Sequence, residues 1–392
     1  MRQRRIFSTG SLPLVIALVL AVAPTAGAQG LGNVEIHGFG GMAYANTDGN
    51  NYLVGTDEGT YDNVNLALNV NAKVTDKLTV VGQAEIFQRP GYDDIDETLD
   101  FAFAEWSFSD AFKLRAGRVK HPFGIYGEIF NVGTLRPFYT LPQSIYGPER
   151  YTARSVDGVG LTGQKAWNSG WGLSYDVYFG RIAGELLNSG VTFAPEDLHN
   201  GYNSTPFSFE QVIGGRLVAT TPVDGLSFGA SAYRGKASLY LFDENGLPRP
   251  TEGAVNFQVE YQAEPVLVRA EYGTIFDDPI VRYDTYYVEG AVKVYKGLQV
   301  AARYDRWEGH LKDKSLHEIE WLDQIQHHKD ISFGVNYWFS PNFALKTSYH
   351  IATGNRYAQP DDPTALVENG GMYDGSFDPD TKMFVIGTHF SF

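Results

Sequence analysis

The chain has 392 residues, a formal net charge of −15 at pH 7 and no cysteine. Such an acidic balance excludes nucleic acid as a partner class, and the lack of cysteine excludes disulfide cross-links. Glycine is abundant at 43 residues, and 24 tyrosines and 25 phenylalanines make the chain rich in aromatic side chains. With no long helical periodicity, this composition favours an all-β protein.

The first residues have the pattern of a secretory signal peptide. Three arginines within the first five residues precede the apolar run 12–22, and 26–28 reads Ala-Gly-Ala. We expect cleavage after this small-residue site. The alternative, a membrane anchor, requires a longer apolar run. Residues 1–28 are therefore expected to be removed, and 29–392 to form the mature domain.

Apolar and polar residues alternate with period two along most of the remaining chain, as the pleat of a β-strand requires. In 62–74, for example, Leu66 and Leu68 share one side, while Asn63 and Asn65 share the other. Sixteen strands are predicted, at 33–45, 62–74, 78–88, 98–108, 112–120, 155–164, 171–180, 208–220, 226–236, 253–263, 266–274, 283–294, 298–308, 329–339, 343–352 and 381–392.

The connections between these strands alternate between short turns and long loops. The long ones are 46–61, 89–97, 121–154, 181–207, 237–252, 275–282, 309–328 and 353–380. This alternation is typical of a transmembrane antiparallel β-barrel, with turns on the periplasmic side and loops outside. A soluble sandwich would also show alternating strands, with the apolar side turned inward. The signal peptide, the connection lengths and the aromatic terminus favour the closed barrel, which pairs every strand edge.

The last predicted strand carries an aromatic pattern on one face. Phe384, Ile386, Thr388, Phe390 and Phe392 alternate, and Phe392 is the final residue. This arrangement resembles the C-terminal assembly signal of bacterial outer-membrane proteins.

The connection 121–154 spans 34 residues without a predicted strand. A connection of this length is either functional or disordered. Phe123, Tyr126, Phe138 and Tyr146 belong to a set of apolar and aromatic residues that a solvated linker would lack. A barrel of sixteen strands encloses an aqueous channel wide enough to accept such a segment. We expect 121–154 to fold into the barrel as a constriction loop that narrows the pore.

Short stretches around this connection carry a family resemblance. Residues 114–118 read Leu-Arg-Ala-Gly-Arg, 120–124 read Lys-His-Pro-Phe-Gly, 149–150 read Glu-Arg, and 157–161 read Asp-Gly-Val-Gly-Leu. The sequence resembles Gram-negative outer-membrane porins, in particular the phosphate- and polyphosphate-selective group. The resemblance covers about 78–165 and the final strand. It implies sixteen strands, a homotrimer and an inward-folded third loop, but not the solute, because the dense basic ladder of a phosphate pore is not found.

Charged residues of both signs are expected inside the barrel, where they can set up a transverse field. The lumen candidates are Glu85, Lys113, Arg115, Asp176, Glu210, Arg216, Glu260, Arg269, Glu271, Glu289, Lys293, Arg303, Asp305, Lys346 and His350. The constriction candidates are Arg115, Arg118, Lys120, Glu128, Arg136, Glu149, Arg150 and Arg154. The alternative is that any water-filled barrel carries such charges. Strict alternation points Arg118 at lipid, whereas the resemblance places it inward, and we expect the inward position through a phase slip near Gly117.

Three other motifs have weaker functional interpretations. Residues 225–229 match the hydrolase pattern G-x-S-x-G, but Ser227 opens a strand, whereas a nucleophile elbow joins a strand to a helix. In 309–328, four histidines accompany a capping box, which predicts a solvated helix over 316–327 and not a metal site. The acidic runs 93–97 and 374–380 are expected to be solvated, with divalent-cation bridges to lipopolysaccharide as the alternative.

These features favour a porin of the bacterial outer membrane through which small hydrophilic solutes or ions diffuse. It is expected to be no enzyme, to use no cofactor or metal, and to contact membrane lipid, lipopolysaccharide and further copies of itself. One alternative is a non-conducting structural or adhesive barrel acting through 181–207 and 353–380. Another is an esterase that uses Ser227. The sign of the selected ion stays open at this point.

Overall fold

The computed structural model describes residues 33–88, 95–147, 155–188, 198–199, 202–239, 251–276, 281–312, 326–359 and 377–392. The expected signal peptide lies outside these residues. Within them, no helix is long and apolar enough to cross a membrane.

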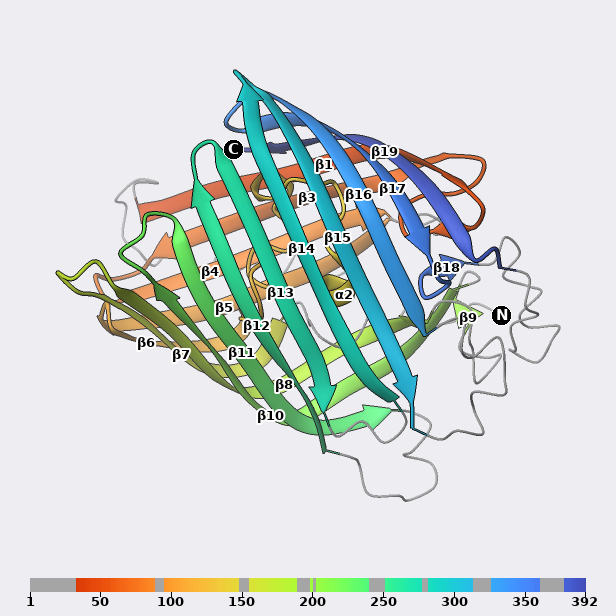
Figure 1. The fold of residues 1–392 in the computed structure, drawn as a ribbon. Helices are drawn as coiled ribbons and strands as arrows, with labels where there is room; N and C mark the ends of the chain where they lie inside the picture. Colours follow the sequence, from red (N-terminus) through yellow and green to blue (C-terminus); the bar gives the residue numbers. More distant parts are fainter. Residues whose placement is uncertain are drawn as a thin grey trace.

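The described chain is built as one closed antiparallel β-barrel (Figure 1). The main sheet counts seventeen strands, of which the two-residue β9 (Leu198–His199) only extends the edge near β10. The other sixteen strands correspond one to one to the predicted strands, so the fold prediction is confirmed. They are β1 (Val34–Asp48), β3 (Thr60–Lys73), β4 (Leu78–Gln88), β5 (Asp96–Ser109), β6 (Phe112–Lys120), β7 (Ser155–Ala166), β8 (Gly172–Asn188), β10 (Tyr202–Thr220), β11 (Leu226–Leu239), β12 (Thr251–Ala263), β13 (Val266–Phe276), β14 (Val281–Tyr295), β15 (Leu298–Leu311), β16 (His327–Ser340), β17 (Phe343–Thr353) and β19 (Asp380–Ser391).

The barrel closes between its first and last strands. β1 pairs with β19 from Phe39 opposite Ser391 to Asp48 opposite Lys382. The terminal aromatics seal this seam, because the Phe392 ring lies directly over Gly38: a Cβ at Gly38 would stand 2.2 Å from Phe392 Cζ. The same two residues exchange backbone hydrogen bonds of 3.0 and 2.8 Å. An aromatic ring over a strand glycine covers backbone that no side chain of the glycine protects.

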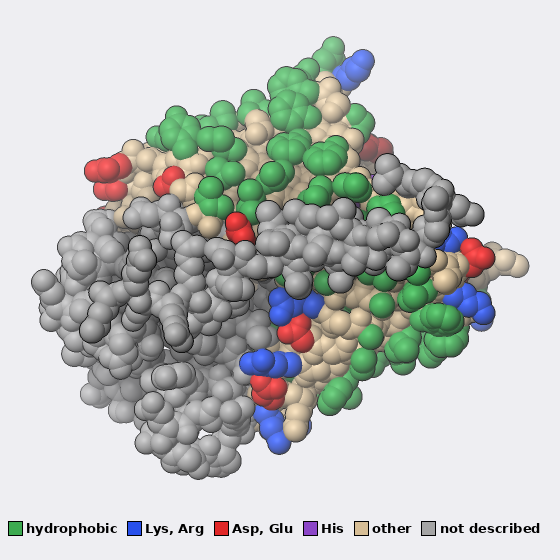
Figure 2. Space-filling view, turned by 180° about the vertical axis from the view of Figure 1, so that it is seen from behind, with side chains coloured by type: hydrophobic (Ala, Val, Ile, Leu, Met, Phe, Trp, Pro, Cys, Tyr) green, Lys and Arg blue, Asp and Glu red, His purple; other side chains and the backbone are tan. Residues whose placement is uncertain are grey.

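The two faces of the barrel wall differ as the alternation predicts. On β3, Leu66 and Leu68 expose 42% and 43% of their surface, whereas Asn63 exposes 5%. Figure 2 shows the same property over a wide area, with hydrophobic side chains covering the outer wall. Because the outward side chains are apolar and the inward ones polar, the wall has the polarity of a membrane barrel and not of a soluble sandwich.

The two strands β8 and β10 extend beyond their predicted bounds. They pair without interruption from Gly172 opposite Thr220 to Gly180 opposite Val212 and, after a register shift, from Ile182 opposite Phe209 to Asn188 opposite Asn203. Gln211, inside the predicted strand 208–220, has a φ of +53° at the bulge that precedes the added residues of β10. Period counting stops at such a bulge because one extra residue reverses the faces.

Four shorter elements complete the described structure. The strands β2 (Asn51–Tyr52) and β18 (Ala358–Gln359) pair with each other. A 3-10 turn η2 (Gly133–Leu135) and a one-turn helix α2 (Gln143–Tyr146) lie within the segment that follows β6. In Figure 1, α2 lies behind the strands β13 to β15.

The expectation for the histidine-rich connection is wrong at its C-terminal end. Of the predicted helix over 316–327, the residues 316–325 lie outside the described part of the chain. Gln326 lies in a turn and His327 begins β16. His328 is buried, with Nδ1 2.6 Å from the hydroxyl of Tyr52. Two added strand residues, and not a helix, therefore carry these imidazoles into the barrel wall.

Candidate functional site

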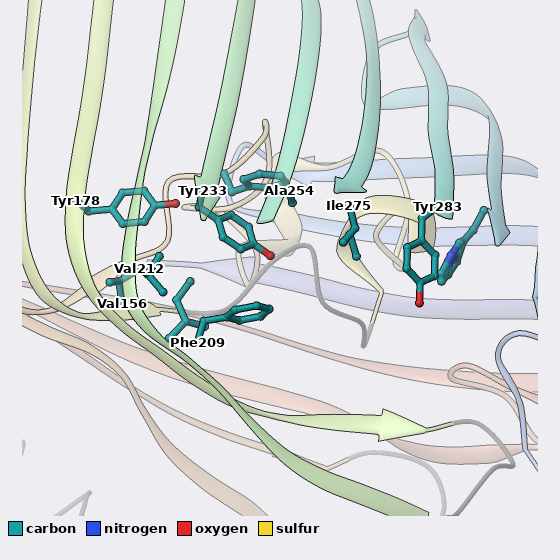
Figure 3. Packing of buried hydrophobic residues seen from close by; sticks show 11 residues of the cluster. Val156, Tyr178, Phe209, Val212, Tyr233, Ala254, Ile275 and Tyr283 are labelled. Atoms are coloured by element: carbon teal, nitrogen blue, oxygen red, sulfur yellow. The ribbon is translucent and has the colours of Figure 1, made fainter. Parts of the chain in front are cut away.

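The described part of the long connection, 121–147, makes its contacts with the inner face of the strands. It starts in an aromatic cluster in which Phe123 is fully buried. The ring of Phe123 lies edge-on to that of Tyr233 at 5.5 Å, and His121 Nε2 lies 2.8 Å from the hydroxyl of Tyr178. Figure 3 shows Tyr178, Tyr233 and Phe209 projecting from their strands into this cluster.

Gly124 turns the segment sharply after the cluster. Its φ is +66°, a conformation that favours glycine, and its amide donates to Ser231 Oγ at 3.0 Å. A Cβ here would stand 2.2 Å from the hydroxyl of Tyr146 and 2.4 Å from Glu271 Oε1. Both the backbone conformation and the space therefore require glycine at this position.

One buried carboxylate connects the two ends of the segment. Glu271 on β13 accepts hydrogen bonds from the amide of Ile125 at 3.0 Å and from the hydroxyl of Tyr146 at 2.6 Å. The hydroxyl of Tyr287 on β14 also donates to it, at 2.6 Å. Glu271 was expected in the lumen, and it faces inward with the segment directly on it.

A second buried group holds the tyrosine in the middle of the segment. The hydroxyl of Tyr126 donates to Glu289 and accepts from Arg269 Nη1 at 2.7 Å. Arg269 also binds Glu260, with Nε 2.7 Å from Oε1. Its guanidinium lies 4.9 Å from the centre of the Tyr126 ring, a cation–π distance. These four side chains come from the wall and from the segment, and each is bonded to at least one of the others.

Basic wall residues donate to backbone carbonyls in the second half of the segment. Lys346 Nζ donates to Gly133 O at 2.6 Å and to Arg136 O. Arg303 donates to the carbonyl and hydroxyl of Thr140 at 3.0 and 2.9 Å. The amide of Asn336 donates to Pro137 O at 2.7 Å. Apart from Gly133 O, which also accepts the amide of Arg136 at 3.4 Å, these carbonyls have no helix or strand to satisfy them, so the wall supplies the donors that buried backbone requires.

Asp305 on β15 receives the start of α2. Its Oδ2 accepts from the amide of Gln143 at 2.5 Å, and its Oδ1 accepts from that of Ser144 at 3.2 Å. The first amides of a helix have no intrahelical acceptor, and a carboxylate placed there satisfies them. His328 Nε2 lies 3.6 Å from the same carboxylate. Asp305 thus belongs to the support of the segment.

Ser348, His350 and Asp330 form a hydrogen-bonded set under this segment. Ser348 Oγ lies 2.9 Å from His350 Nε2, and His350 Nδ1 lies 2.8 Å from Asp330 Oδ2. These distances match those of a hydrolase triad. All three side chains are buried, however, and the Phe138 ring lies edge-on to the imidazole at 6.3 Å. We interpret the set as a polar support for Phe138, because no substrate atom has access to the serine.

A cavity of about 300 Å³ separates the segment from the wall formed by β1 and β3 to β6. Three of the sequence-predicted constriction residues line it together. The full lining is Phe39, Asn69, Val81, Gln83, Phe101, Phe103, Arg115, Lys120, Glu128, Asn131 and Val132.

The two basic residues of this cavity are held by acids and by aromatic rings. Lys120 Nζ lies 2.6 Å from Asp100 Oδ2 and 5.6 Å from the centre of the Phe101 ring. Arg115 Nε lies 2.7 Å from Glu105 Oε2, and its guanidinium lies 5.2 Å from the Phe103 ring centre. The cations are thereby fixed at the cavity wall.

Glu128 is the acidic residue that the segment brings to this cavity. It accepts a hydrogen bond from Arg216 and lies 3.9 Å from Arg115 Nη1. Burial raises the pKa of the Glu128 carboxyl, but the positive charges of Arg216, Arg115 and Lys120 outweigh that effect and leave it below the ordinary value of 4.5. Arg216 is shared with Asp176, 2.9 Å away. Glu128 therefore stays ionised at neutral pH.

Sequence reasoning missed part of this cavity. Asp100 receives Lys120, the amide of Gln83 at 2.6 Å and that of Asn131 at 3.2 Å. The register of β4 and β5 shifts next to this residue, so both Asp100 and Phe101 point inward. Strict alternation would turn only one of these two neighbouring side chains inward. A lone acid between apolar residues was the available signal for a bulge.

The expected inward position of Arg118 is wrong. β6 pairs with β7 without a register shift along its length, so the phase slip expected at Gly117 does not occur. Arg118 shares its face with Leu114, which is 39% exposed. It binds Asp157, with Nε–Oδ1 at 2.7 Å and Nη2–Oδ2 at 3.1 Å. Gly117 has a φ of +127°, but this distortion inserts no residue into the ladder.

Glu210 is likewise turned outward, although it was expected in the lumen. Phe209 is buried on the inner face, and a register shift of β10 follows between Glu210 and Ile213. Glu210 Oε1 lies 2.6 Å from Arg181 Nε. The bulge reverses the phase of the strand, which the sequence pattern alone did not reveal.

The remaining candidates take different positions. Glu85 is buried and accepts from Asn131 at 2.8 Å, and Lys113 lies 3.6 Å from Glu105. Lys293 pairs with exposed Glu264 next to a short turn. Arg136 donates to Phe130 O at 3.2 Å within the segment. Three further constriction candidates lie outside the described residues, namely Glu149, Arg150 and Arg154. Among the described residues, no three histidine or acidic side chains are grouped to hold a metal ion.

Comparison with known proteins shows the fold of the chain. No family model and no curated protein matches it. Among solved structures, Salmonella typhi OmpF in complex with daunomycin aligns over 92% of this chain and 97% of that chain, with 16% identity and a TM-score of 0.54. The anion-selective porin from Comamonas acidovorans aligns over 92% and 99%, with 12% identity and a TM-score of 0.54. The outer-membrane channel DcaP of Acinetobacter baumannii aligns over 92% and 97%, with 11% identity and a TM-score of 0.54.

Proposed function

We propose that the chain is a porin of the bacterial outer membrane in which 121–147 crosses the lumen and sets the minimum pore area. The observation that carries this proposal is the pair of anchors at opposite sides of the barrel. Asn131 donates to Glu85 on β4, while Tyr126 donates to Glu289 on β14. In the strand order these strands are seven steps apart in one direction and nine in the other.

The pore is a passive, water-filled path for small hydrophilic solutes or ions. A barrel of sixteen strands leaves an aqueous channel, and the segment reduces it to spaces such as the cavity beside Arg115, Lys120 and Glu128. Charges of both signs meet there, which favours orientation of polar solutes over simple exclusion of one ion. No covalent step is needed. The short turns face the periplasm, and the long connections face outward, where lipopolysaccharide surrounds an assembly of three copies.

Deletion of 125–147 with a short glycine linker tests the proposal. The backbone hydrogen bonds between the barrel strands do not involve this segment, so the variant is expected to fold and insert. Its single-channel conductance in planar bilayers should exceed that of the full chain, because the narrowest part is removed. Heat-dependent migration in gels reports folding in parallel. A folded deletion variant with unchanged conductance would show that the segment does not limit the pore.

A non-conducting structural or adhesive barrel acting through 181–207 and 353–380 is the competing function. Both proposals share the same wall, so the decisive measurement is whether the wild-type protein conducts at all. Stepwise current increases in a bilayer support the porin. A correctly folded protein without any such steps supports the adhesive barrel. The polar anchors and the charged cavity favour the porin. The interior of a barrel that does not conduct would be more stable with apolar packing than with these buried charges.

A further inference from the structure

A row of alternating charges crosses the outer wall of the barrel over five neighbouring strands. It consists of Arg118 on β6, Asp157 on β7, Arg181 on β8, Glu210 on β10 and Lys236 on β11, and we call it the outer charge row. Figure 2 shows basic and acidic side chains alternating in such a line on the outer surface, with hydrophobic side chains beyond it. Asp157 stands opposite Arg181 in the strand register, and Glu210 stands opposite Lys236.

The row lies at one edge of the apolar wall, toward the long connections. Going away from the short turns, Arg181 follows two residues after Phe179, which is 54% exposed. Asp157 likewise lies two residues beyond Val159, which is 47% exposed. Alternation places these pairs on the same outward face, so the hydrocarbon-facing belt ends where the charges begin. Charges on the lipid face are costly at mid-depth and tolerated near the interface.

The acids of the row hold the arginines in place while leaving them exposed. Arg118 and Asp157 side chains are 38% and 41% exposed, and Arg181 is 53% exposed. Arg181 uses its Nε on Glu210, whereas Arg118 uses Nε and Nη2 on Asp157 and Nη1 on the carbonyl of Leu99 at 3.2 Å. A guanidinium carries five N–H donors, so each arginine keeps further donors suited to phosphate. The row holds three bases and two acids, a net charge of +1, in a chain whose net charge is −15.

We propose that the outer charge row binds the phosphate groups of a phosphorylated glycolipid of the outer leaflet, with the acyl chains lying on the apolar wall below. The proposal rests on the membrane placement proposed above, which puts the long connections outside. The position supplies both halves of the recognition: an apolar wall at acyl-chain level and fixed guanidiniums at headgroup level. The alternative occupant of the row is a second copy of this chain, which would need a surface of complementary charge. The test below distinguishes this alternative from the lipid.

Native mass spectrometry of the detergent-solubilised full chain tests the site. The probes are bisphosphorylated lipid A, the same lipid without phosphates, and phosphatidylglycerol. Each basic residue near a membrane surface contributes about 1 kcal/mol, so Arg118→Gln with Arg181→Gln should weaken binding of bisphosphorylated lipid A about 30-fold. The matched control is Lys73→Gln, an exposed base paired with Asp76 at the short turn after β3, at 58% exposure on the opposite side of the membrane. It should leave binding unchanged.

The outcomes separate the sources of the signal. Retention of bisphosphorylated lipid A over the other two probes, lost in the double variant, supports the proposal. Equal binding of all three probes, or equal binding by the double variant, overturns it. A double variant that dissociates into single chains while wild type does not would assign the row to contact between copies, and would also overturn it. Single-channel conductance should not change in either variant, so failure of the lipid site leaves the porin proposal intact.

Discussion

The carboxylate of Glu271 is predicted to keep the segment 121–147 closed, and Glu271→Gln tests this. Glu271 Oε1 accepts the amide of Ile125 at 3.0 Å, and Oε2 accepts the hydroxyls of Tyr146 and Tyr287 at 2.6 Å each. A glutamine side chain has a single carbonyl oxygen. Whichever way its amide is oriented, an N–H₂ group therefore faces at least one of these donors, and that donor loses its acceptor.

The size of the effect follows from the burial of these groups. Leaving one buried donor unsatisfied costs about 1–3 kcal/mol. This range applies here because Glu271 is only 3% exposed. The wall strands keep their backbone ladders, so the penalty falls on the closed position of the segment and not on the barrel. A difference of about 1–3 kcal/mol changes a population about 5- to 150-fold. Openings of the segment should become more frequent by that factor.

Single-channel recording in planar bilayers provides the assay. The expected result for Glu271→Gln is a larger fraction of time at a higher conductance level, with the main level unchanged. Tyr287→Phe is the matched control, because it removes one bond to the same carboxylate from the wall and none from the segment. A Glu271→Gln channel as quiet as wild type would refute the idea that this carboxylate holds the segment across the pore.

Four further outcomes are expected. Lys120→Ala should shift the reversal potential toward cations, by about twofold in permeability ratio for a charge ~8 Å from the ion in water, and less at high salt. Glu128→Gln should shift it toward anions; since the pKa of Glu128 lies below its ordinary value, wild type should change in this direction only when the pH falls below that value. Arg150→Ala and Arg154→Ala should each shift the reversal potential toward cations at low salt, and an unchanged reversal potential in both would exclude them from the pore. Ser227→Ala should leave ester hydrolysis at background, and loss of a measurable activity would reveal an enzyme.

The strand pattern was readable from the sequence because every strand has one side in contact with apolar surroundings. A period of two then appears directly in the residue types, as in Leu66 and Leu68 of β3. Pairing in a closed barrel also fixes the order of neighbours, so topology followed from counting. The ends of β8 and β10 were missed because the register of this pair shifts between Phe209 and Val212, where an extra residue interrupts the period of two.

The site was less readable because it depends on single-residue irregularities. Asp100 and Glu210 adjoin bulges, and a bulge reverses the inward and outward faces without a distinct sequence signature. Gly117 misled in the other direction, since its positive φ is accommodated with no inserted residue. Family resemblance placed Arg118 inward, whereas plain alternation gave its observed face. Local periodicity was the better guide for Arg118 but not for Lys120, which lines the cavity although strict alternation in the same regular ladder turns it outward.

The wall charges divide into two groups that alternation cannot distinguish. Three buried bases donate to segment carbonyls, namely Arg269, Arg303 and Lys346, whereas Arg115 and Lys120 line the cavity. These three bases hold the segment through its uncharged carbonyls. The segment lies over them and screens their charge from solutes in the pore. Lys346→Met should therefore increase channel noise with little change in reversal potential, and Lys120→Ala should do the reverse. If both variants shifted the reversal potential equally, the lumen charges would act as one field, and the segment would not divide them.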